Sequence, residues 1–326
     1  MFKKINFIYE TKKWSIFDDG LNIKKYNNDI ILSKYPIIIP FYIKLIHFGS
    51  INLLFKFSFL LPFLKKIHIK IVCSWFHIDD SGKNFNNYYM IYKYVDIWHV
   101  TNEEIKKCLI GFGINKNKIK IINLGFDNQV FYKYQENEIK AQKKIYNIPN
   151  KLVIGSFVKD SPGFGNSLDP KSIKRPELFI EIVKKINERE EIFVLLTGPS
   201  RGYILDKLKE NKINHKYIGN ISKKELSTIM NLIDINLISS LREGGPKSVI
   251  ETSSCGKFIL STFVGMVPQI VSKYKNGFLY NNIGDFNLDK FFEQYKNFNG
   301  IIDMNNFISE YSWKSISKEY KDKLYS

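Results

Sequence analysis

Short apolar runs alternate with longer stretches of helical periodicity along the whole chain. This alternation is typical of α/β proteins with parallel sheets. In the first half, the predicted strands are Ile5–Tyr9, Tyr42–His47, Ile69–Ser74, Ile97–Val100 and Lys120–Asn123. We therefore expect a Rossmann-like, doubly wound domain over residues 1–130.

Helix signals in the first half are of two kinds. Glu104 follows Thr101 by three residues, as in a capping box, so Thr101 is predicted to cap a helix. Residues 51–66 are strongly apolar with a basic end. A buried helix against the sheet is the first interpretation, and a patch lying on a membrane is the alternative.

The second half repeats the α/β pattern after a polar, Lys-rich segment, 131–150, that we predict to be a linker. A second doubly wound domain is expected over 151–305, and an amphipathic helix within 306–326 is expected to cross back to the first domain. Its predicted strands are Leu152–Phe157, Ile192–Leu196, Lys216–Ile218, Ile235–Ile238, Phe258–Leu260 and Gly277–Tyr280. Its predicted helices are Pro176–Asn187, Tyr203–Asn211, Lys223–Leu232, Lys247–Cys255 and Val267–Ser272.

Ligands of open α/β sheets bind beyond the carboxyl ends of the strands. Two such domains therefore predict a site in a cleft between them, built from the loops that follow strands. The length of 326 residues suits two domains of this kind.

Composition changes the picture in one respect. The net charge of +17 suggests a polyanion as partner, but 45 of the 49 basic residues are Lys, beside many Ile, Asn, Phe and Tyr, all with AT-rich codons. The excess is also even: residues 1–140 hold 21 Lys and 12 acids, hence +9, and the rest carries 17 − 9 = +8. Nucleic-acid binders usually concentrate their charge, so no nucleic-acid partner is expected.

Several other classes are excluded or unsupported. The three cysteines form neither a disulfide framework nor a metal-ligand spacing. No stretch reaches the roughly 18 apolar residues of a membrane span. The start of the chain is predicted to be a strand and not a signal peptide. We expect a cytoplasmic protein, with peripheral attachment to the inner face of the membrane as the membrane alternative.

The segment that carries most chemistry is SSLREGGPKSVIE, residues 239–251. It reads as a strand, a glycine turn and a helix whose amino terminus suits a phosphate group. Glu243 precedes the helix and Glu251 lies inside it, on the order of 10 Å away at 1.5 Å per residue. That separation fits the two ends of one extended ligand with a diphosphate between them.

This block resembles the Glu-x7-Glu motif of retaining GT-B glycosyltransferases of the family-4, or group 1, type. The resemblance extends through IGSFVKD, SIKRPELFIEIVKK, VLLTGPSRG, YIGNISKKEL and NGFLY over about 150–282. Residues 96–131 also look like the last helix and strand of the N-terminal domain. Pro246 stands where many relatives have Gly, so one possible N–H donor is missing.

The resemblance implies roles for donor-binding residues. Glu251 would bind the ribose of a nucleotide-sugar, and Glu243 with the Gly244–Gly245 turn would hold the sugar. A basic pair would bind the diphosphate, with Lys174 favoured over Lys159 and with Arg175 beside it. The remaining predicted donor contacts are Gly198 and, near the nucleobase, Ile221.

The first half offers weaker candidates, all expected at strand ends facing the cleft. His77 resembles the family's strand–His loop and, with Glu243 and Lys174, completes the predicted catalytic set. His47 is a second candidate. Asp19 and Gly20 resemble a loop that approaches donor or acceptor.

No Asp-x-Asp occurs, so no metal and no other cofactor is expected. The predicted activity is metal-independent, retaining transfer of a hexose from a UDP- or GDP-type nucleotide-sugar to a glycan or lipid-linked acceptor, as in polysaccharide biosynthesis. Two alternatives stay open. One is a nucleotide-sugar epimerase on the same fold, and the other is a non-catalytic polyanion-binding or transferase-complex subunit.

Overall fold

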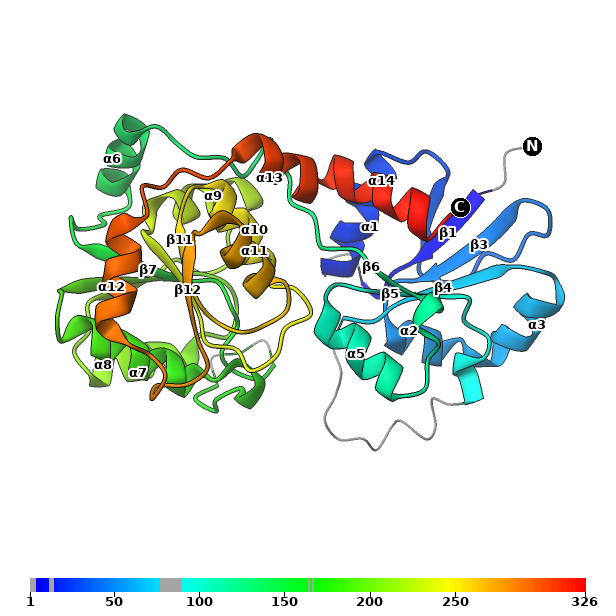
Figure 1. Cartoon of the computed structure of the whole chain (residues 1–326), viewed down its shortest axis with the longest axis horizontal. Helices are drawn as coiled ribbons and strands as arrows, with labels where there is room; N and C mark the ends of the chain where they lie inside the picture. Colours follow the sequence, from blue (N-terminus) through cyan, green and yellow to red (C-terminus); the bar gives the residue numbers. More distant parts are fainter. Residues whose placement is uncertain (1–3, 12–14, 77–89, 164, 166) are drawn as a thin grey trace. The chain divides into compact units, whose positions relative to one another are not determined.

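The computed structural model describes residues 4–11, 15–76, 90–163, 165 and 167–326. The chain divides into two compact units, drawn in Figure 1. The first unit comprises Met1–Gly125 together with Ser309–Ser326, and the second unit is Phe126–Ile308.

The first unit is built on a six-stranded parallel sheet with the order β2-β1-β3-β4-β5-β6. Apolar side chains on both faces of its strands explain why both faces must be covered. The strands are β1 Lys4–Ile8, β2 Ile30–Ser33, β3 Ile43–Phe48, β4 Lys70–Ser74, β5 Ile97–Val100 and β6 Ile119–Ile121.

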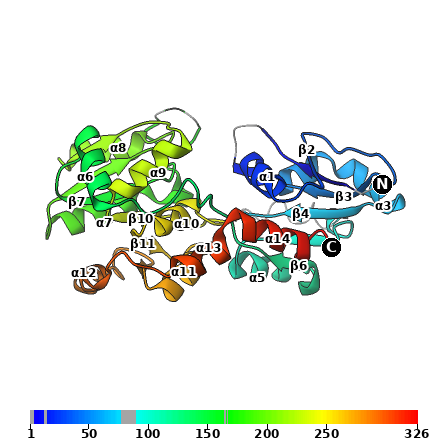
Figure 2. The same cartoon turned by 90° about the horizontal axis from the view of Figure 1, so that it is seen from above.

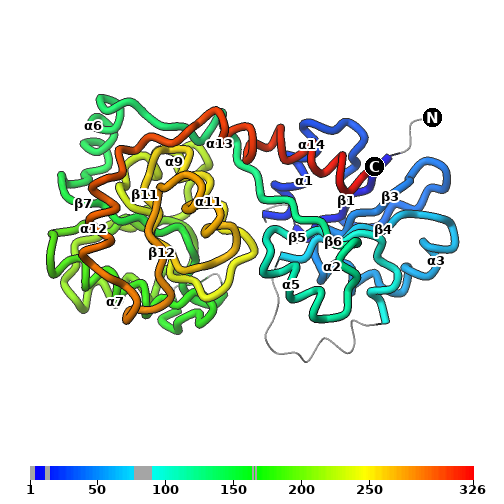
Figure 3. Tube along the Cα trace, in the orientation of Figure 1, coloured from blue at the N-terminus to red at the C-terminus, as the bar shows by residue number. Residues whose placement is uncertain are grey.

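Two groups of helices cover this sheet. On one face, α1 Ser15–Lys25 and the C-terminal helix α14 Trp313–Lys323 pack side by side, as the tube in Figure 3 shows in blue and red. Trp313, Ile316 and Tyr320 of α14 share a core with Phe7 and Leu45 of the strands. The other face is covered by α2 Ile51–Lys56, the 3-10 turn η1 Ser58–Leu60, α3 Leu61–Lys66 and α5 Glu103–Gly111.

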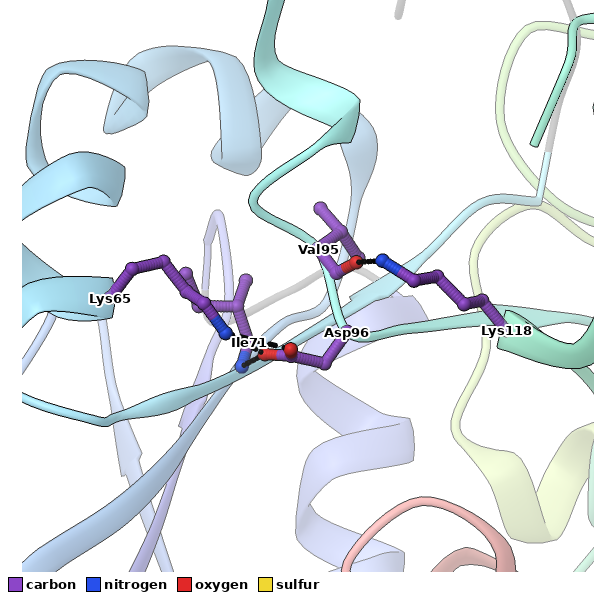
Figure 4. A network of polar contacts seen from close by, with 5 residues as sticks. All are labelled: Lys65, Ile71, Val95, Asp96 and Lys118. Carbon is purple, nitrogen blue, oxygen red and sulfur yellow. Dashed lines mark hydrogen bonds and ion pairs between the residues drawn. The ribbon is translucent and has the colours of Figure 1, made fainter. Parts of the chain in front are cut away.

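A polar network fixes the entry to β4 and β5 (Figure 4). Asp96 accepts from Lys65 Nζ of α3 at 2.7 and 2.9 Å and from the N–H of Ile71 at 2.8 Å. Lys118 Nζ, in the 3-10 turn η2 Lys116–Lys118, donates to Val95 O at 3.0 Å. The end of α3 is therefore tied to the amino ends of two strands.

The second unit has its own six-stranded parallel sheet, in the order β12-β11-β10-β7-β8-β9. Counted from β7, this is the Rossmann order, and the order reverses between the neighbours β7 and β10. The strands are β7 Leu152–Ser156, β8 Ile192–Leu196, β9 His215–Tyr217, β10 Ile235–Ile238, β11 Phe258–Thr262 and β12 Gly277–Tyr280.

Helices again cover both faces of this sheet. The largest core packs one face against α7 Pro176–Asn187, α8 Gly202–Glu210 and α12 Leu288–Asn297. On the other face lie α9 Lys223–Leu232 and α6 Glu136–Ile145, which contact each other (Figure 2). The remaining helices are α10 Lys247–Ser254, α11 Val267–Tyr274 and α13 Met304–Tyr311, within which the unit boundary falls.

The predicted architecture of two parallel-sheet domains is confirmed, and the differences are local. The pattern missed α1, β2, α12 and α13. The cap of α5 is Asn102, whose side chain accepts from Ile105 N at 2.9 Å, and not Thr101. The segment 131–150 belongs to the second unit and contains α6, because Tyr134 N donates to Asn231 Oδ1 of α9 at 2.9 Å.

Residues 51–66 form α2, η1 and α3 in succession and not one long helix. Pro62 lies in the first turn of α3, where its missing N–H costs no helical hydrogen bond. Within the described ranges, no helix has both the length and the apolar character needed to cross a membrane.

Candidate functional site

The reversal of strand order in the second unit marks the expected ligand position, beyond the carboxyl ends of β7 and β10. A small cleft lies there, between the loop after β7 and the turn before α7. Its lining includes Ser156, Lys159, Asp160, Lys174 and Ser239. The site is therefore built from the same loops that the sequence singled out.

Lys174 and Glu243 meet in this region as an ion pair. Lys174 ends the 3-10 turn η3 Ser172–Lys174, and its Nζ lies 2.5 Å from Glu243 Oε1. Ser240 Oγ donates to the same oxygen at 2.7 Å. The side chains are 15% and 9% exposed, so both charges are largely removed from water yet remain reachable.

Hydrogen bonds to main-chain carbonyls fix the positions of the two segments that carry this ion pair. Leu241 N donates to Ile173 O at 2.9 Å, and Ser239 Oγ donates to Lys174 O at 3.0 Å. The loop after β11 supports the other side, because Thr262 Oγ1 donates to Ser240 O at 2.5 Å. The pair is therefore preorganised by the fold.

Two further lysines lie near the pair. Burial lowers the pKa of Lys171, and the positive charges of Lys174 and Lys159 lower it further, whereas Glu243 raises it. Three ammonium groups close enough to repel one another, with one carboxylate among them, suit an anion carrying more than one charge. The sequence did not single out Lys171, since only folding brings it beside Lys174.

A buried ion pair supports the loop that carries these lysines. Arg201 Nε lies 3.2 Å from Asp160 Oδ2, and the two side chains are 0% and 2% exposed. Burial raises the pKa of Asp160, and Arg201 opposes that effect. Burial also lowers the pKa of Arg201 to about 10. Asp160 O accepts from Lys171 N at 2.7 Å, so the pair helps to place the lysine cluster.

Helix α10 begins directly after the glycine turn. Pro246 is its N-cap and makes no side-chain capping bond. Gly265, with φ 54, packs its Cα against this turn, where an added Cβ would lie 3.1 Å from Glu243 O. Glu251 is the fifth residue of α10 and is half-buried.

The other predicted donor contacts lie around the same edge of the sheet. Arg175 caps α7 in the left-handed region, with φ 47, and its Nη1 donates to Asn281 O at 2.7 Å. Gly198, with φ 88, follows β8 and accepts from Tyr217 Oη at 2.8 Å. Ile221 precedes α9 and packs on the core beneath it. No three His, Cys, Asp or Glu side chains of the described residues gather as a metal-ligand group.

In the first unit, Asp19 and Gly20 do not lie in a loop. Both are buried in α1, and Gly20 allows that helix to approach the sheet, because an added Cβ would lie 2.9 Å from the Phe7 ring. His77 lies outside the described residues.

The prediction that His47 sits at an open strand end is wrong. It lies within β3 and is fully buried. Its Nδ1 pairs with Tyr325 Oη and its Nε2 with Ser74 Oγ, both at 2.8 Å. Ser74 Oγ also lies 2.8 Å from His99 Nδ1.

This network has an electrostatic consequence. Burial lowers the pKa of His47 well below its usual value and that of His99 to about 4. Burial likewise raises the pKa of Tyr325. Both imidazoles are therefore neutral at neutral pH, and they hold the C-terminal residues against the sheet.

Two Rossmann-like units with a charged cluster at the strand-order reversal of the second define the GT-B class of fold. Residues 164–286 match the model of the family described as glycosyl transferases group 1. A protein of Klebsiella pneumoniae, described as an uncharacterized 41.2 kDa protein in the cps region, is 26% identical over 182 residues. That match covers 54% of this chain and 45% of the relative, somewhat under half of its length.

Solved structures confirm the fold. HepE of Anabaena, in complex with UDP and glucose, is similar with a TM-score of 0.79 and 14% identity, covering 99% of this chain and 100% of that one. The lipopolysaccharide outer core galactosyltransferase WaaB, in apo form, is similar with a TM-score of 0.68 and 13% identity, covering 99% of each chain. At these identities the similarity concerns the fold alone.

Proposed function

We propose that this protein is a retaining, metal-independent glycosyltransferase that moves a hexose from a nucleotide-sugar to a hydroxyl of a glycan or lipid-linked acceptor. The observation that carries the proposal is the preorganised Lys174–Glu243 pair at the reversal of strand order, among three lysines and before α10. The group 1 family match of residues 164–286 supports it.

The lysines and α10 would act on the donor diphosphate. Lys174 and Lys171 offer cationic donors, and the amino end of α10 offers dipole and N–H groups. These groups would stabilise the charge that develops on the leaving diphosphate, in place of a metal ion. Lys174 is paired with Glu243, so a diphosphate would share Lys174 with that carboxylate.

Glu243 and Glu251 would grip the two ends of the donor. Glu243, with Gly244 and Gly245, would contact the sugar, and Glu251 the ribose. In the retaining reaction the acceptor hydroxyl attacks C1 from the face that the diphosphate leaves. The C1–O bond to phosphate breaks, and the leaving phosphate oxygen takes the acceptor proton.

Two relatives bear on donor and acceptor. HepE was solved with UDP and glucose, which favours a UDP-sugar as the first donor to test. The Klebsiella relative is described by its place in a cps region, which is consistent with a glycan acceptor.

Calorimetry of the full chain with UDP, GDP and ADP and with their glucose derivatives tests the donor site. We expect one nucleotide series to bind and to raise the melting temperature. Affinity for none of them would contradict the proposal. Product analysis by NMR, with and without acceptor, then identifies the anomer formed. A sugar isomer made without acceptor would identify an epimerase instead.

A further inference from the structure

Large apolar side chains are unusually exposed in one part of the first unit. Among the described residues, fifteen large hydrophobic side chains are exposed, and five of them fall within residues 35–63. We call these five the aromatic patch: Tyr35, Ile39, Phe41, Phe59 and Phe63, which are 64, 50, 89, 74 and 49% exposed. Scattered exposed apolar residues are ordinary, but such a concentration marks a surface with a partner.

The topology brings the two halves of the patch to one edge of the sheet. Tyr35, Ile39 and Phe41 lie in the loop before β3, and Phe59 and Phe63 lie in the segment before β4. Strands β3 and β4 are parallel neighbours, with Leu45 opposite Lys70, so both segments enter at the amino edge. Figure 1 shows α3 and the start of β3 at the same end of this unit.

Side-chain contacts join the two segments. The Tyr35 ring lies 6.2 Å from the Phe57 ring, and Lys56 Nζ lies 5.8 Å from the Tyr35 ring centre. Figure 4 shows Lys65 of α3 bound to Asp96, which anchors the helix that carries Phe63. The patch therefore lies on a fixed surface.

The exposed rings do not contribute to the hydrophobic core. Of the apolar segment 51–66, Leu53, Leu54, Leu61 and Leu64 point into the core, whereas Phe59 and Phe63 do not. Phe41 has φ 65, a conformation that favours glycine, yet it carries the most exposed ring of the patch. Glycine or a polar residue would satisfy this turn at lower cost, so the ring needs another explanation.

The charged residues near the patch indicate the chemical class of its partner. Residues 30–78 contain six lysines and no Asp or Glu. Lys34, Lys56 and Lys66 are exposed beside the patch residues in the sequence. Aromatic rings beside exposed lysines match the boundary of a bilayer that bears anionic headgroups.

We propose that the aromatic patch docks this protein on the surface of an anionic membrane. Phe41, Phe59 and Phe63 enter the headgroup region, and the lysines contact lipid phosphates. Because the patch lies at the amino edge of the sheet, docking leaves the carboxyl edge of the same sheet free. The inference goes beyond sugar transfer and depends on no donor or acceptor.

Co-sedimentation of the full chain with phosphatidylcholine vesicles, with and without phosphatidylglycerol, tests the proposal. We expect binding to the anionic vesicles, weakened by salt. The variant Phe41→Ser/Phe59→Ser/Phe63→Ser should bind at least about ten-fold more weakly. The variant Lys34→Gln/Lys56→Gln/Lys66→Gln should lose most of the preference for phosphatidylglycerol.

A matched control removes three exposed apolar side chains of the second unit, as Ile145→Ser/Leu168→Ser/Ile301→Ser. It should bind vesicles like the parent chain. Equal loss in the control, or no binding of the parent to anionic vesicles, would overturn the proposal. So would sedimentation showing that the patch residues instead hold two copies of the chain together. Nucleotide binding by calorimetry is read separately, so a failed donor site would not be mistaken for failed docking.

Discussion

The polar side chains of the two units differ in burial and in hydrogen bonding. In the first unit, His47, Ser74 and His99 are completely buried, neutral and bonded to one another. In the second unit, Lys171, Lys174 and Glu243 stay partly accessible at the end of the sheet. Polar groups fully satisfied by the protein have no capacity left for a ligand, whereas a crowded cationic cluster has.

This difference indicates which polar residues contribute to stability and which contribute to ligand binding. Removing a member of the buried network should lower the free energy of unfolding. Removing a member of the cationic cluster should lower activity far more than it lowers stability.

The largest loss of unfolding free energy is expected at the buried Arg201–Asp160 ion pair, which supports the loop of the lysine cluster. Arg201→Met leaves the Asp160 carboxylate buried without its cation, which should cost about 3–5 kcal/mol of unfolding free energy. Urea unfolding measures the loss. Arg189→Met is the control, because Arg189 pairs with Asp289 at the surface, where about 1 kcal/mol or less is expected. The double variant Asp160→Asn/Arg201→Met should recover part of the loss, and further destabilisation would contradict the ion-pair explanation.

Acid should weaken the buried network of the first unit. The pKa of His99 is about 4 in the folded chain against 6.5 when unfolded. Above pH 6.5 both states are neutral at this residue, so its contribution is fully present. As the pH falls from 6.5 towards 4, only the unfolded state gains the proton, and stability falls by up to about 3 kcal/mol.

The pH dependence has a specific control. His99→Gln should flatten the slope of unfolding free energy against pH in this window, whatever its effect on stability at pH 7. His215→Gln, in which a partly exposed histidine of the second unit is replaced, should keep the slope. An unchanged slope in His99→Gln would show that other groups cause the acid sensitivity.

The cationic cluster should instead control transfer. Glu243→Gln and Lys174→Ala should each reduce kcat/KM by on the order of 10²-fold or more, about 2.7 kcal/mol, because each removes a charge aimed at the donor. Glu293→Gln and Lys144→Ala, at exposed positions of the same unit, are the matched controls and should retain activity. Full activity in both site variants would contradict the site assignment.

Much of the second unit could be predicted because its signals are local. Helices α7 and α9 and strands β8, β10 and β12 have the predicted bounds, since caps, prolines and apolar runs mark their ends. β2 was missed, because its four residues run into the apolar segment that follows. α12 begins at the polar cap Asn287 and carries few apolar residues, so its stripe of Phe291 and Phe292 gave little signal.

The site was predictable only in part, for a related reason. Lys174 and Glu243 stand beside motifs that the sequence displays. Lys171 becomes part of the site only because folding brings it close to other lysines, and nothing nearby in the sequence distinguishes it. His47 looked like a strand-end histidine, because its partner Tyr325 is 278 residues away and only folding brings that hydroxyl to the ring. Burial and long-range partners are set by tertiary packing, which spacing does not encode.

The smallest effect is expected from removal of the Tyr325 hydroxyl, the distant partner of His47. Tyr325→Phe removes the hydroxyl from His47 Nδ1 and leaves a buried ring nitrogen without a partner, at a cost of about 1–3 kcal/mol. Urea unfolding should show this loss, while Tyr132→Phe, at an exposed tyrosine of the second unit, should change little. Nucleotide affinity of Tyr325→Phe should remain that of the parent chain, because the lost hydrogen bond belongs to the sheet of the first unit. A large loss of nucleotide affinity with unchanged stability would contradict the roles assigned to the two sheets. The fully buried network of the first unit would then control ligand binding.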